Sequence, residues 1–339
     1  MPASPQMSDV IVIGAGLSGL TAARDLRAAG ADVVVLEKSR GVGGRAATRR
    51  WAGWPVDHGA QFFTARSEDF RAQVDAWLEQ GTCFAWARGF HQWQDGQLQS
   101  QPTDGFPRYA CPLGMTSLAK DLAGAAQDFI RFGTKVSSVA RHENAWHVTA
   151  EDATAHSAPA LIVTLPPPQG ADLLMPCAPA SAALLGELVV TPCLALVAKY
   201  PRQPIEWHGI QAPDHPVISW IGHDTSKRPA LHPDGTVLVI HASTTFSRDN
   251  FHAEEPWLVA HLLATAHEMT GLELSAPESF FLQRWRYALT ADPGSIGSQI
   301  PTDHAPPQLI MAGEAMAGGK IEGAWLSGRA AARAIIDAA

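Results

Sequence analysis

Three glycines with a fixed spacing follow the first apolar run of the chain and are suited to bind a phosphate group. The segment Gly14-Ala15-Gly16-Leu17-Ser18-Gly19 has the pattern G-x-G-x-x-G between a β-branched run and a stretch with helical spacing of apolar residues. In such a turn the first glycine permits a tight bend, the second lets a pyrophosphate approach the backbone, and the third lets helix and strand pack closely. The first N–H groups of the helix then face the phosphates. The alternative is a plain glycine turn in an ordinary strand–helix–strand unit.

A glutamate stands where the second apolar run ends. Glu37 follows Val33-Val34-Val35-Leu36, a run typical of a strand buried on both faces of a parallel sheet. A carboxylate at this point can accept hydrogen bonds from both hydroxyls of an adenosine ribose, and it would repel a 2′-phosphate. Strand, glycine turn, helix, second strand and acid together predict a dinucleotide-binding unit.

A second glycine cluster follows directly, with the sequence Lys38-Ser39-Arg40-Gly41-Val42-Gly43-Gly44-Arg45. A fold that binds only NAD would simply continue at this point. The amides around Gly44, with Lys38 and Arg45, are suited to hold a second part of the pyrophosphate and a ribityl chain. The alternative is a solvated basic loop.

The composition excludes several classes of function. The chain has 339 residues, which favours about two domains, and 25 Lys and Arg against 33 Asp and Glu give a net charge of −8. No basic run occurs, so we expect neither nucleic acid nor an anionic membrane as a partner. We also expect no secretory signal and no membrane-spanning helix, because the chain start lacks positive charge and no apolar stretch is long enough.

The cysteines and histidines give no sign of a metal site. No C-x-x-C and no H-E-x-x-H pattern occurs in the sequence. We therefore expect no bound metal, and we expect reduced thiols in a cytoplasmic protein. The thiols in question are Cys83, Cys111, Cys177 and Cys193.

Apolar periodicity predicts the elements that must position these residues. Helices are expected at Leu17–Ala29, Glu68–Gln80, Thr116–Ala126, Trp257–Thr270 and Gly323–Ala338. Strands are expected at Val10–Ile13, Val33–Leu36, Val136–Arg141, Trp146–Ala150, Leu161–Leu165, Leu188–Tyr200, Val217–Ile221, Thr236–Ala242, Phe280–Tyr287 and Leu309–Ala312, with short antiparallel strands in 82–109. Pro166-Pro167-Pro168 is expected to break regular structure, and 166–179 to cross between two domains.

The chain resembles the flavin monoamine oxidase superfamily, which binds FAD through the glycine turn, the following glutamate and a G-G-R loop. Four further segments are similar to that family: Asp57 to Thr64, Gly114 to Leu118, Gly313-Glu314, and Glu322 to Gly328. Within the superfamily the chain looks most like the bacterial renalase branch. The residues that carry this are Lys38 to Gly41, Gly59 to Arg66, His241 to Ser243, Trp285 to Ala288 and Glu322 to Gly328.

The resemblance implies an α/β fold with two domains. The first is a discontinuous Rossmann-type FAD-binding domain made of residues 1–68, 110–170 and 288–339. The second is an α+β substrate domain on a mixed or antiparallel sheet, made of residues 69–109 and 171–287. The whole would be like monoamine oxidase and p-hydroxybenzoate hydroxylase.

The resemblance also implies which residues meet FAD. Beyond the two glycine segments and Glu37, they are Gln61, Phe62, Val136, Thr164, Gly313, Glu314, Gly323, Ala324, Trp325 and Ser327. The small residues of the last segment would let a helix begin close to the flavin ring, with its dipole facing reduced flavin. Since no cysteine lies in that segment, we expect non-covalent FAD.

A renalase-type reaction is the activity that the resemblance implies. The substrates would be isomers of reduced NAD(P) with the hydride on ring carbon 2 or 6, and the products NAD(P)⁺ and, after reoxidation by molecular oxygen, hydrogen peroxide. Flavin N5 would accept the hydride, and the reaction would repair a metabolite that blocks dehydrogenases. Aromatisation drives hydride loss, so position matters more than a strong base.

Aromatic side chains and one histidine are the candidates for the substrate pocket: His241, Trp285, Trp220, Phe63 and Tyr287. Each has an alternative role as a core residue. Charged residues near them, Arg284, Arg286, Lys227 and Arg228, would contact a substrate pyrophosphate unless they are merely solvated. Two other functions stay open: an amine oxidase or other desaturating flavoenzyme of the superfamily, and a flavin-binding protein without turnover.

Overall fold

The computed structural model describes residues 5–51, 53–100, 105–125, 127–231, 235–293 and 307–338. The chain forms two compact units. The first consists of Met1–Ala46, Leu118–Val190 and Thr290–Ala339, and the second of Ala47–Ser117 and Thr191–Leu289. The units divide the chain at points other than the expected domains, since 47–68 and 110–117 fall in the second unit and 171–190 in the first.

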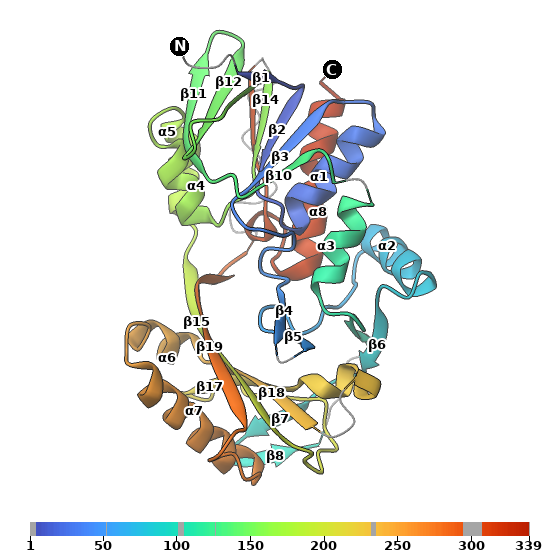
Figure 1. The fold of residues 1–339 in the computed structure, drawn as a ribbon, viewed down its shortest axis with the longest axis vertical. Coiled ribbons are helices and arrows are strands. Elements are labelled where there is room, and N and C mark those ends of the chain that lie inside the picture. The colour runs from blue at the N-terminus through green and yellow to red at the C-terminus, as the bar shows by residue number, and fades with distance from the viewer. Residues whose placement is uncertain are drawn as a thin grey trace. The chain divides into compact units, whose positions relative to one another are not determined.

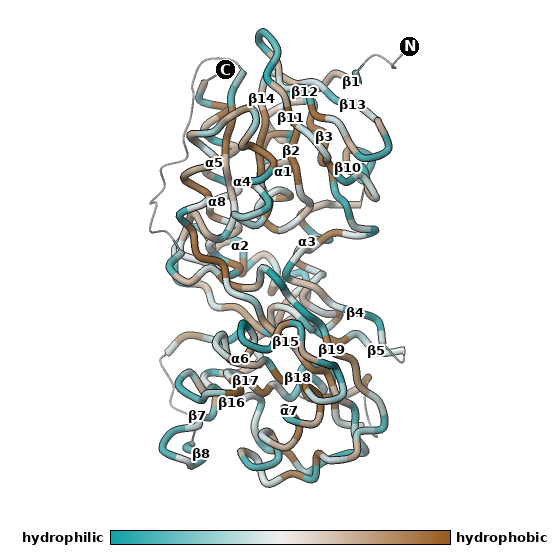
Figure 2. Tube along the Cα trace, turned by 90° about the vertical axis from the view of Figure 1, so that its left-hand side faces the viewer, coloured by the Kyte–Doolittle hydropathy of each residue, from teal (hydrophilic) through white to brown (hydrophobic). Residues whose placement is uncertain are grey.

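A parallel sheet forms the centre of the first unit. Among the described residues it has five strands, in the order β10 (Ile130–Phe132), β3 (Val33–Glu37), β2 (Val10–Ile13), β14 (Ala160–Val163) and β20 (Gln308–Met311). Every pairing in this sheet is parallel. β2, β3 and β14 are wholly buried and appear as hydrophobic segments in Figure 2. Continuous apolar strands of this kind are stable only when both faces of the sheet are covered.

Helices α1 (Leu17–Ala28) and α8 (Lys320–Ile336) lie side by side in the first unit, although they are far apart in the sequence (Figure 1). Their close approach needs a glycine. A Cβ added at Gly328 would lie 2.3 Å from the carbonyl oxygen of Ser18. The C-terminal helix is therefore built against the helix that follows the glycine turn.

The other face of the parallel sheet is covered by a smaller sheet and two helices. In the described chain this sheet has four strands in the order β1 (Gln6–Met7), β13 (Ala155–Ala158), β12 (Ala145–Ala150) and β11 (Val136–His142). Ile11 and Leu161 of the parallel sheet share an apolar cluster with Val148 and with Leu174 and Leu185 of the two helices. These helices are α4 (Pro167–Leu174) and α5 (Pro179–Gly186).

The expectation that 166–168 breaks regular structure is wrong. Pro167 and Pro179 stand in the first turns of α4 and α5, where a missing N–H costs no helical hydrogen bond. The passage from the first unit to the second occurs at Val190 and Thr191 rather than within 166–179.

A mixed sheet organises the second unit. Within the described ranges it has seven strands in the order β19 (Ser279–Thr290), β15 (Val190–Pro201), β18 (Gly235–Ala242), β17 (Ile218–His223), β16 (Gly209–Gln211), β7 (His91–Gln94) and β8 (Gln97–Gln99). Helix α7 (Glu255–Thr270) covers one face, where Leu258 and Leu262 pack with Leu238 and Ile240 of β18. Because side chains alternate along a strand, Val237, Val239 and His241 lie on the other face.

Shorter elements complete the structure. The second unit also holds α2 (Glu68–Glu79), α6 (Thr244–Asp249), the antiparallel pairs β4 (Thr48–Trp51) with β5 (Trp54–Asp57) and β6 (Phe84–Ala87) with β9 (Arg108–Ala110), and the 3₁₀ turns Asp224–Lys227 and Pro229–Leu231. α3 (Thr116–Ala123) straddles the unit boundary, and a 3₁₀ turn at Glu314–Met316 precedes α8. The predicted Rossmann-type α/β fold with a second unit on a mixed sheet is confirmed. None of the helices in the described ranges is long and apolar enough to cross a membrane.

Candidate functional site

The glycine turn of the first unit has the geometry of a phosphate cradle. Gly14 has φ +106, a conformation that favours glycine, and a Cβ added at Gly19 would lie 2.1 Å from the Gly14 carbonyl oxygen. Around a Cβ built on Gly16 there is no described atom within 4 Å. Gly14 is thus required by its backbone conformation and Gly19 by close packing, whereas Gly16 leaves open space at the start of α1.

The first turn of α1 retains hydrogen-bonding capacity. Gly16 caps the helix without a side-chain hydrogen bond, and the first turn contains no acidic residue. Ser18 Oγ is buried and has no hydrogen-bond partner among the described residues. Leu17 is buried beside it. An anion at this helix end would meet unpaired N–H groups and the positive end of the helix dipole.

Glu37 is held at the end of β3 by two backbone amides. Oε2 accepts a hydrogen bond from Ala15 N at 2.8 Å, and Oε1 accepts one from Ser39 N at 2.7 Å. Each carboxylate oxygen can accept a second hydrogen bond, so the pair retains capacity for two ribose hydroxyls. The side chain is buried, with 8% of the residue exposed.

The second glycine loop lies against the first. Gly43 N donates to Ala15 O at 2.9 Å, and a Cβ added at Gly44 would lie 3.5 Å from Gly16 Cα. Arg45 follows, and its Nη1 donates to Glu314 Oε1 at 2.7 Å. Lys38, earlier in the loop, is exposed.

The C-terminal acidic turn is linked to the same loop. Glu314 Oε1 also accepts a hydrogen bond from Thr290 Oγ1 at 2.7 Å, and Gly313 N donates to Ser327 Oγ at 3.0 Å. The turn therefore binds Arg45 through Glu314 and the middle of α8 through Ser327.

Two further predicted cofactor residues belong to the first unit. Thr164 Oγ1 donates to Ile13 O at 2.8 Å and to Gly14 O at 3.2 Å, so this hydroxyl supports the glycine turn from behind. Val136 opens β11 and packs against the apolar cluster of the parallel sheet.

The last helix begins earlier than the sequence suggested. α8 starts at Lys320, so Gly323 N already donates to Gly319 O at 3.0 Å, and the expected start at Gly323 is wrong. A Cβ added at Gly323 would lie 2.4 Å from Ala317 O, which explains the small residue by packing. Ala324 is partly exposed, whereas Trp325 is buried.

The donor set of the first unit fits an adenine dinucleotide. An uncapped helix start, a buried carboxylate with spare acceptor capacity, and an arginine fixed by Glu314 surround one pair of glycine loops. These residues would hold the pyrophosphate and the adenosine ribose. Gln61 and Phe62 belong to the second unit and are described with it below.

The second unit gathers four of the five pocket candidates on one face of its sheet. Trp220 and His241 are register partners in the antiparallel pair β17–β18, so their side chains lie on the same face. That face carries Val239, which packs with partly buried Phe281. Alternation along β19 puts the two remaining candidates, Trp285 and Tyr287, on the side of Phe281.

Phe63 lies elsewhere. It forms an isolated bridge with Tyr109 and packs edge-on against Phe70 and Trp77 of α2. With 3% of the residue exposed, its surroundings are those of a core side chain. Its neighbour Phe62 contacts Trp220, with ring centroids 5.4 Å apart.

His58 and His241 are kept neutral. Burial lowers the pKa of His58 to about 4, against the opposing charge of Asp57. Burial also lowers the pKa of His241 to about 4, and the positive charge of Lys227 adds to the effect. His58 stacks on Trp285 with ring centroids 5.3 Å apart and an interplanar angle of 13°.

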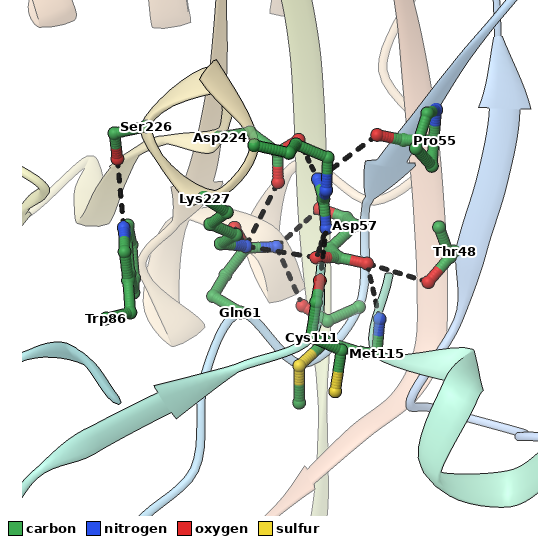
Figure 3. Close-up of polar contacts among 12 residues, drawn as sticks. Thr48, Pro55, Asp57, Gln61, Trp86, Cys111, Met115, Asp224, Ser226 and Lys227 are labelled. Atoms are coloured by element: carbon green, nitrogen blue, oxygen red, sulfur yellow. Dashed lines mark hydrogen bonds and ion pairs between the residues drawn. The ribbon is translucent and has the colours of Figure 1, made fainter. Parts of the chain in front are cut away.

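Four charged residues of the second unit form a buried cluster, shown in Figure 3. Asp57 Oδ2 accepts hydrogen bonds from Arg228 Nη2 at 2.6 Å and from Lys227 Nζ at 3.2 Å. Asp224 accepts from the same two cations, at 2.6 Å from Arg228 and 3.0 Å from Lys227. The exposed fraction of these four side chains is 0% or 1%.

The cluster balances two cations against two carboxylates. Burial would raise the pKa of Asp57, but Lys227, Arg228 and hydrogen bonds from Thr48 and Met115 outweigh it and hold the pKa at about 2. The side chain is thus an anion at all ordinary pH values. Hydrogen bonds of this kind offset the cost of burying the charges.

The expectation of substrate contacts from Lys227 and Arg228 is wrong, because both cations are buried and bonded to carboxylates. Arg284 donates to the backbone carbonyls of Phe251 and Ala253. The sequence analysis did not predict that these four charged residues form a cluster. The spacing Asp224-x-x-Lys227-Arg228, which places three of them on one turn, is the sequence pattern that could have indicated it.

Two family models match the sequence. The model described as flavin containing amine oxidoreductase matches residues 79–336, and the NAD(P)-binding Rossmann-like domain matches residues 12–77. The first match covers well over half of the chain. The second covers both glycine loops.

Solved structures share the whole fold at low sequence identity. Putrescine oxidase bound to putrescine is 16% identical, with a TM-score of 0.75 over 98% of this chain and 100% of that chain. Cyclohexylamine oxidase from Brevibacterium oxydans IH-35A is also 16% identical, with a TM-score of 0.76 over 97% of this chain and 99% of that chain. Identity this low shows the fold alone.

Curated relatives match over a short segment. AofH of Mycobacterium tuberculosis (strain ATCC 25618 / H37Rv), which carries the name of a flavin-containing monoamine oxidase, is 50% identical over 58 residues. This segment is 17% of this chain and 13% of that protein. The L-amino-acid oxidase of Echis ocellatus is 53% identical over 53 residues, 15% of this chain and 10% of that protein. From the family match over residues 79–336, the chain belongs to the flavin containing amine oxidoreductases, a family of FAD-dependent oxidoreductases.

Proposed function

We propose that the chain is an FAD-dependent oxidase of the renalase type. Its substrates are the 2- and 6-dihydro isomers of NAD(P), and its second substrate is molecular oxygen. The dihydropyridine loses a hydride and becomes NAD(P)⁺, while oxygen takes up the two electrons and two protons and leaves as hydrogen peroxide. Bound FAD supplies the hydride acceptor that connects the two half-reactions.

The charge state of the second unit carries this proposal. Asp57 and Asp224, the two carboxylates of the buried cluster, are each bonded to both Lys227 and Arg228. His241, whose pKa is lowered partly by Lys227, is neutral. This cluster therefore supplies no unpaired anion for a cationic amine. A neutral dihydropyridine ring suits such a site, and it needs no general base because aromatisation drives hydride loss.

The aromatic residues of the sheet face are suited to orient a flat ring. Trp220 is 7% exposed and packs against Gly209 and Gly222. A Cβ added at Gly209 would lie 2.2 Å from the Trp220 ring. Trp285 is held by a hydrogen bond from its Nε1 to His58 O and by stacking on the His58 ring. Fixed rings of this kind limit the orientations of a planar substrate and favour a near-attack pose.

We propose that FAD is bound non-covalently. The four cysteines are free thiols, and none belongs to the segment 313–328 that the resemblance brings toward the flavin. Burial raises the pKa of Cys83 and of Cys193 to about 12, so neither is a ready thiolate nucleophile. Unfolding in acid should release all of the flavin into the supernatant.

Amine oxidation is the second candidate. The family is that of flavin containing amine oxidoreductases, and two structural neighbours are putrescine oxidase and cyclohexylamine oxidase. These support an amine substrate as directly as the sequence resemblance supports a dihydronicotinamide. The paired carboxylates of the buried cluster favour the dihydronicotinamide. A flavin-binding protein without turnover is a third possibility.

An aerobic assay separates the three functions. The purified holoprotein is supplied with 2-dihydro-NAD, 6-dihydro-NAD, ordinary 4-dihydro-NAD, putrescine or cyclohexylamine, and oxygen uptake, peroxide and NAD⁺ are measured. We expect turnover with the 2- or 6-isomer and equal amounts of peroxide and NAD⁺. Turnover with the amines alone would establish the second candidate, and no turnover with any compound the third.

A further inference from the structure

The ammonium group of Lys227 uses its three N–H donors on three acceptors. Nζ lies 3.0 Å from Asp224 Oδ1, 3.2 Å from Asp57 Oδ2 and 3.3 Å from Gln61 Oε1. The same ammonium lies 5.1 Å from the centroid of the Trp86 ring. Of the three hydrogen bonds, the one to Gln61 has a neutral acceptor and connects the charge cluster to a residue outside it (Figure 3).

Gln61 is hydrogen-bonded to the backbone of its own loop. With Oε1 directed at Lys227, Nε2 donates to the carbonyls of Asp57 at 2.5 Å and Gly59 at 3.1 Å. The amide has two N–H groups, and both are thereby used. Reversing the amide would bring its oxygen against two carbonyl oxygens and its NH₂ group against the Lys227 ammonium, so the carbonyls and Lys227 together hold this one orientation.

The carbonyl between these two holds Trp285. His58 O accepts a hydrogen bond from Trp285 Nε1 at 2.9 Å, and the His58 ring stacks on the indole. Three successive carbonyls, those of Asp57, His58 and Gly59, thus accept hydrogen bonds from side chains. The indole cannot keep its hydrogen bond if the loop turns its middle carbonyl away.

We propose that Lys227 is a positioning residue for Trp285, acting through Gln61 and the loop Asp57–Gly59. Its ammonium fixes the Gln61 amide, the amide fixes the loop, and the loop fixes the orientation of the indole on the sheet face. The consequence for the reaction rests on the proposed function, in which Trp285 orients the substrate ring. The structural part does not depend on the substrate.

This role differs from a contribution to stability alone. Buried ion clusters often add little net stability, because desolvation of the charges offsets their attraction. Arg228 already forms an ion pair with Asp57, so the Lys227–Gln61 contact is not needed to neutralise Asp57. What that contact adds is a charge-assisted hydrogen bond that fixes the position of the Gln61 amide.

Four variants of the holoprotein test the proposal. Lys227→Met removes the ammonium, and Lys227→Met/Asp224→Asn removes it together with one carboxylate, so that the remaining buried charges, Arg228 and Asp57, stay balanced. Gln61→Met keeps the neutral charge of the side chain but removes the acceptor for Lys227 and both N–H donors.

Lys199→Met is the matched control. Lys199 pairs with Glu278 and lies 4.5 Å from the Trp54 ring in the same unit, with a side chain that is 23% exposed.

The first readout is the indole N–H resonance of Trp285 in protein with ¹⁵N-labelled tryptophan, assigned by its loss in Trp285→Phe. We expect this resonance to move in Lys227→Met, Lys227→Met/Asp224→Asn and Gln61→Met and to stay in place in Lys199→Met. Because Lys227→Met leaves an unbalanced buried charge and can fail to fold, the charge-balanced double variant decides the role of Lys227. An unmoved Trp285 resonance in the double variant or in Gln61→Met would overturn the proposal.

The second readout is steady-state kinetics with the dihydro-NAD isomer, 2 or 6, that the wild-type protein oxidises. We expect Gln61→Met to raise KM about tenfold, the effect of one lost charge-assisted hydrogen bond, with a smaller change in kcat. An unchanged KM would overturn the effect on substrate orientation. If the wild-type protein oxidises neither 2-dihydro-NAD nor 6-dihydro-NAD, the proposed function fails, while the resonance of Trp285 still decides whether Lys227 positions the indole.

Discussion

The guanidinium of Arg45 and the carboxylate of Glu314 form an ion pair of 2.7 Å across 269 positions of the sequence. The same Glu314 oxygen accepts the hydroxyl of Thr290, and the Glu314 side chain is only 10% exposed. One carboxylate thus fixes both the second glycine loop and the segment that leads to the last helix. This pair explains how the two ends of the chain form one cofactor unit.

Glu314→Ala should destabilise the first unit. It leaves Thr290 Oγ1 without its acceptor and removes the charge partner of Arg45, so the free energy of unfolding should fall by about 1–3 kcal/mol. Urea denaturation measures the change. Glu151→Ala is the control, because Glu151 pairs with Lys135 in the same unit with both side chains more than half exposed, and such pairs contribute little. Equal losses in the two variants would contradict this reading.

The glycines of the first turn should separate folding from cofactor binding. Gly19→Ala forces a methyl group to within 2.1 Å of the Gly14 carbonyl oxygen, so we expect loss of stability even without FAD. Gly16→Ala meets no described atom within 4 Å and has φ −76, which alanine adopts readily. We expect it to fold normally and to bind FAD more weakly, because its methyl group obstructs the approach of the pyrophosphate.

Circular dichroism melting of the apoproteins and equilibrium titration with FAD measure the two effects. Normal FAD affinity in Gly16→Ala would show that the pyrophosphate does not lie over this glycine. Normal apoprotein stability in Gly19→Ala would show that the helix can move away from the turn.

Stability should fall as the pH drops below about 6.5. Burial lowers the folded-state pKa of His58, His223 and His241 to about 4 each, from 6.5. The unfolded chain therefore binds more protons between these values, and the stability present above 6.5 is lost as the pH falls toward 4. The slope is up to about 1.4 kcal/mol per pH unit for each histidine. Asp57, with its pKa at about 2, adds a loss only below its ordinary value of 3.8.

Urea midpoints measured across this pH range test the prediction. His58→Phe retains an aromatic ring against Trp285 and removes one titrating group, so its slope should be smaller than that of the wild type by about one proton. A midpoint that does not change between about pH 6.5 and about pH 4.5 would mean that the three histidines titrate normally.

Local sequence patterns predicted part of the first unit. The glycine turn, its flanking elements and the buried strands β14 and β20 follow from apolar runs and turn residues that are neighbours in the chain, whereas β10, α4 and α5 were not predicted. Glu37 was recognised because its place at the end of a strand is a local signal. The prediction that the prolines at 166–168 break regular structure was wrong because proline interrupts a helix in its interior but is favoured in its first turn. Only the residues that follow distinguish these two positions.

The buried cluster could not be predicted in the same way. Asp57 and Lys227 are 170 positions apart, and in isolation a lysine followed by an arginine is typical of a solvated loop. Their burial depends on how the strand pair β4–β5 and the turn after β17 come together. The surroundings of Phe63 could not be predicted from sequence either, because an aromatic residue next to a predicted flavin-binding segment is as suited to the protein core as to a substrate pocket.

Anaerobic mixing with the holoprotein tests the central claim most directly. The flavin absorbance is followed after addition of 2-dihydro-NAD or 6-dihydro-NAD, and separately after addition of putrescine or cyclohexylamine. We predict rapid bleaching by one or both dihydronicotinamide isomers, release of NAD⁺ in an amount equal to the flavin, and no bleaching by the amines. Bleaching by the amines with an unchanged spectrum in the presence of both isomers would contradict the account.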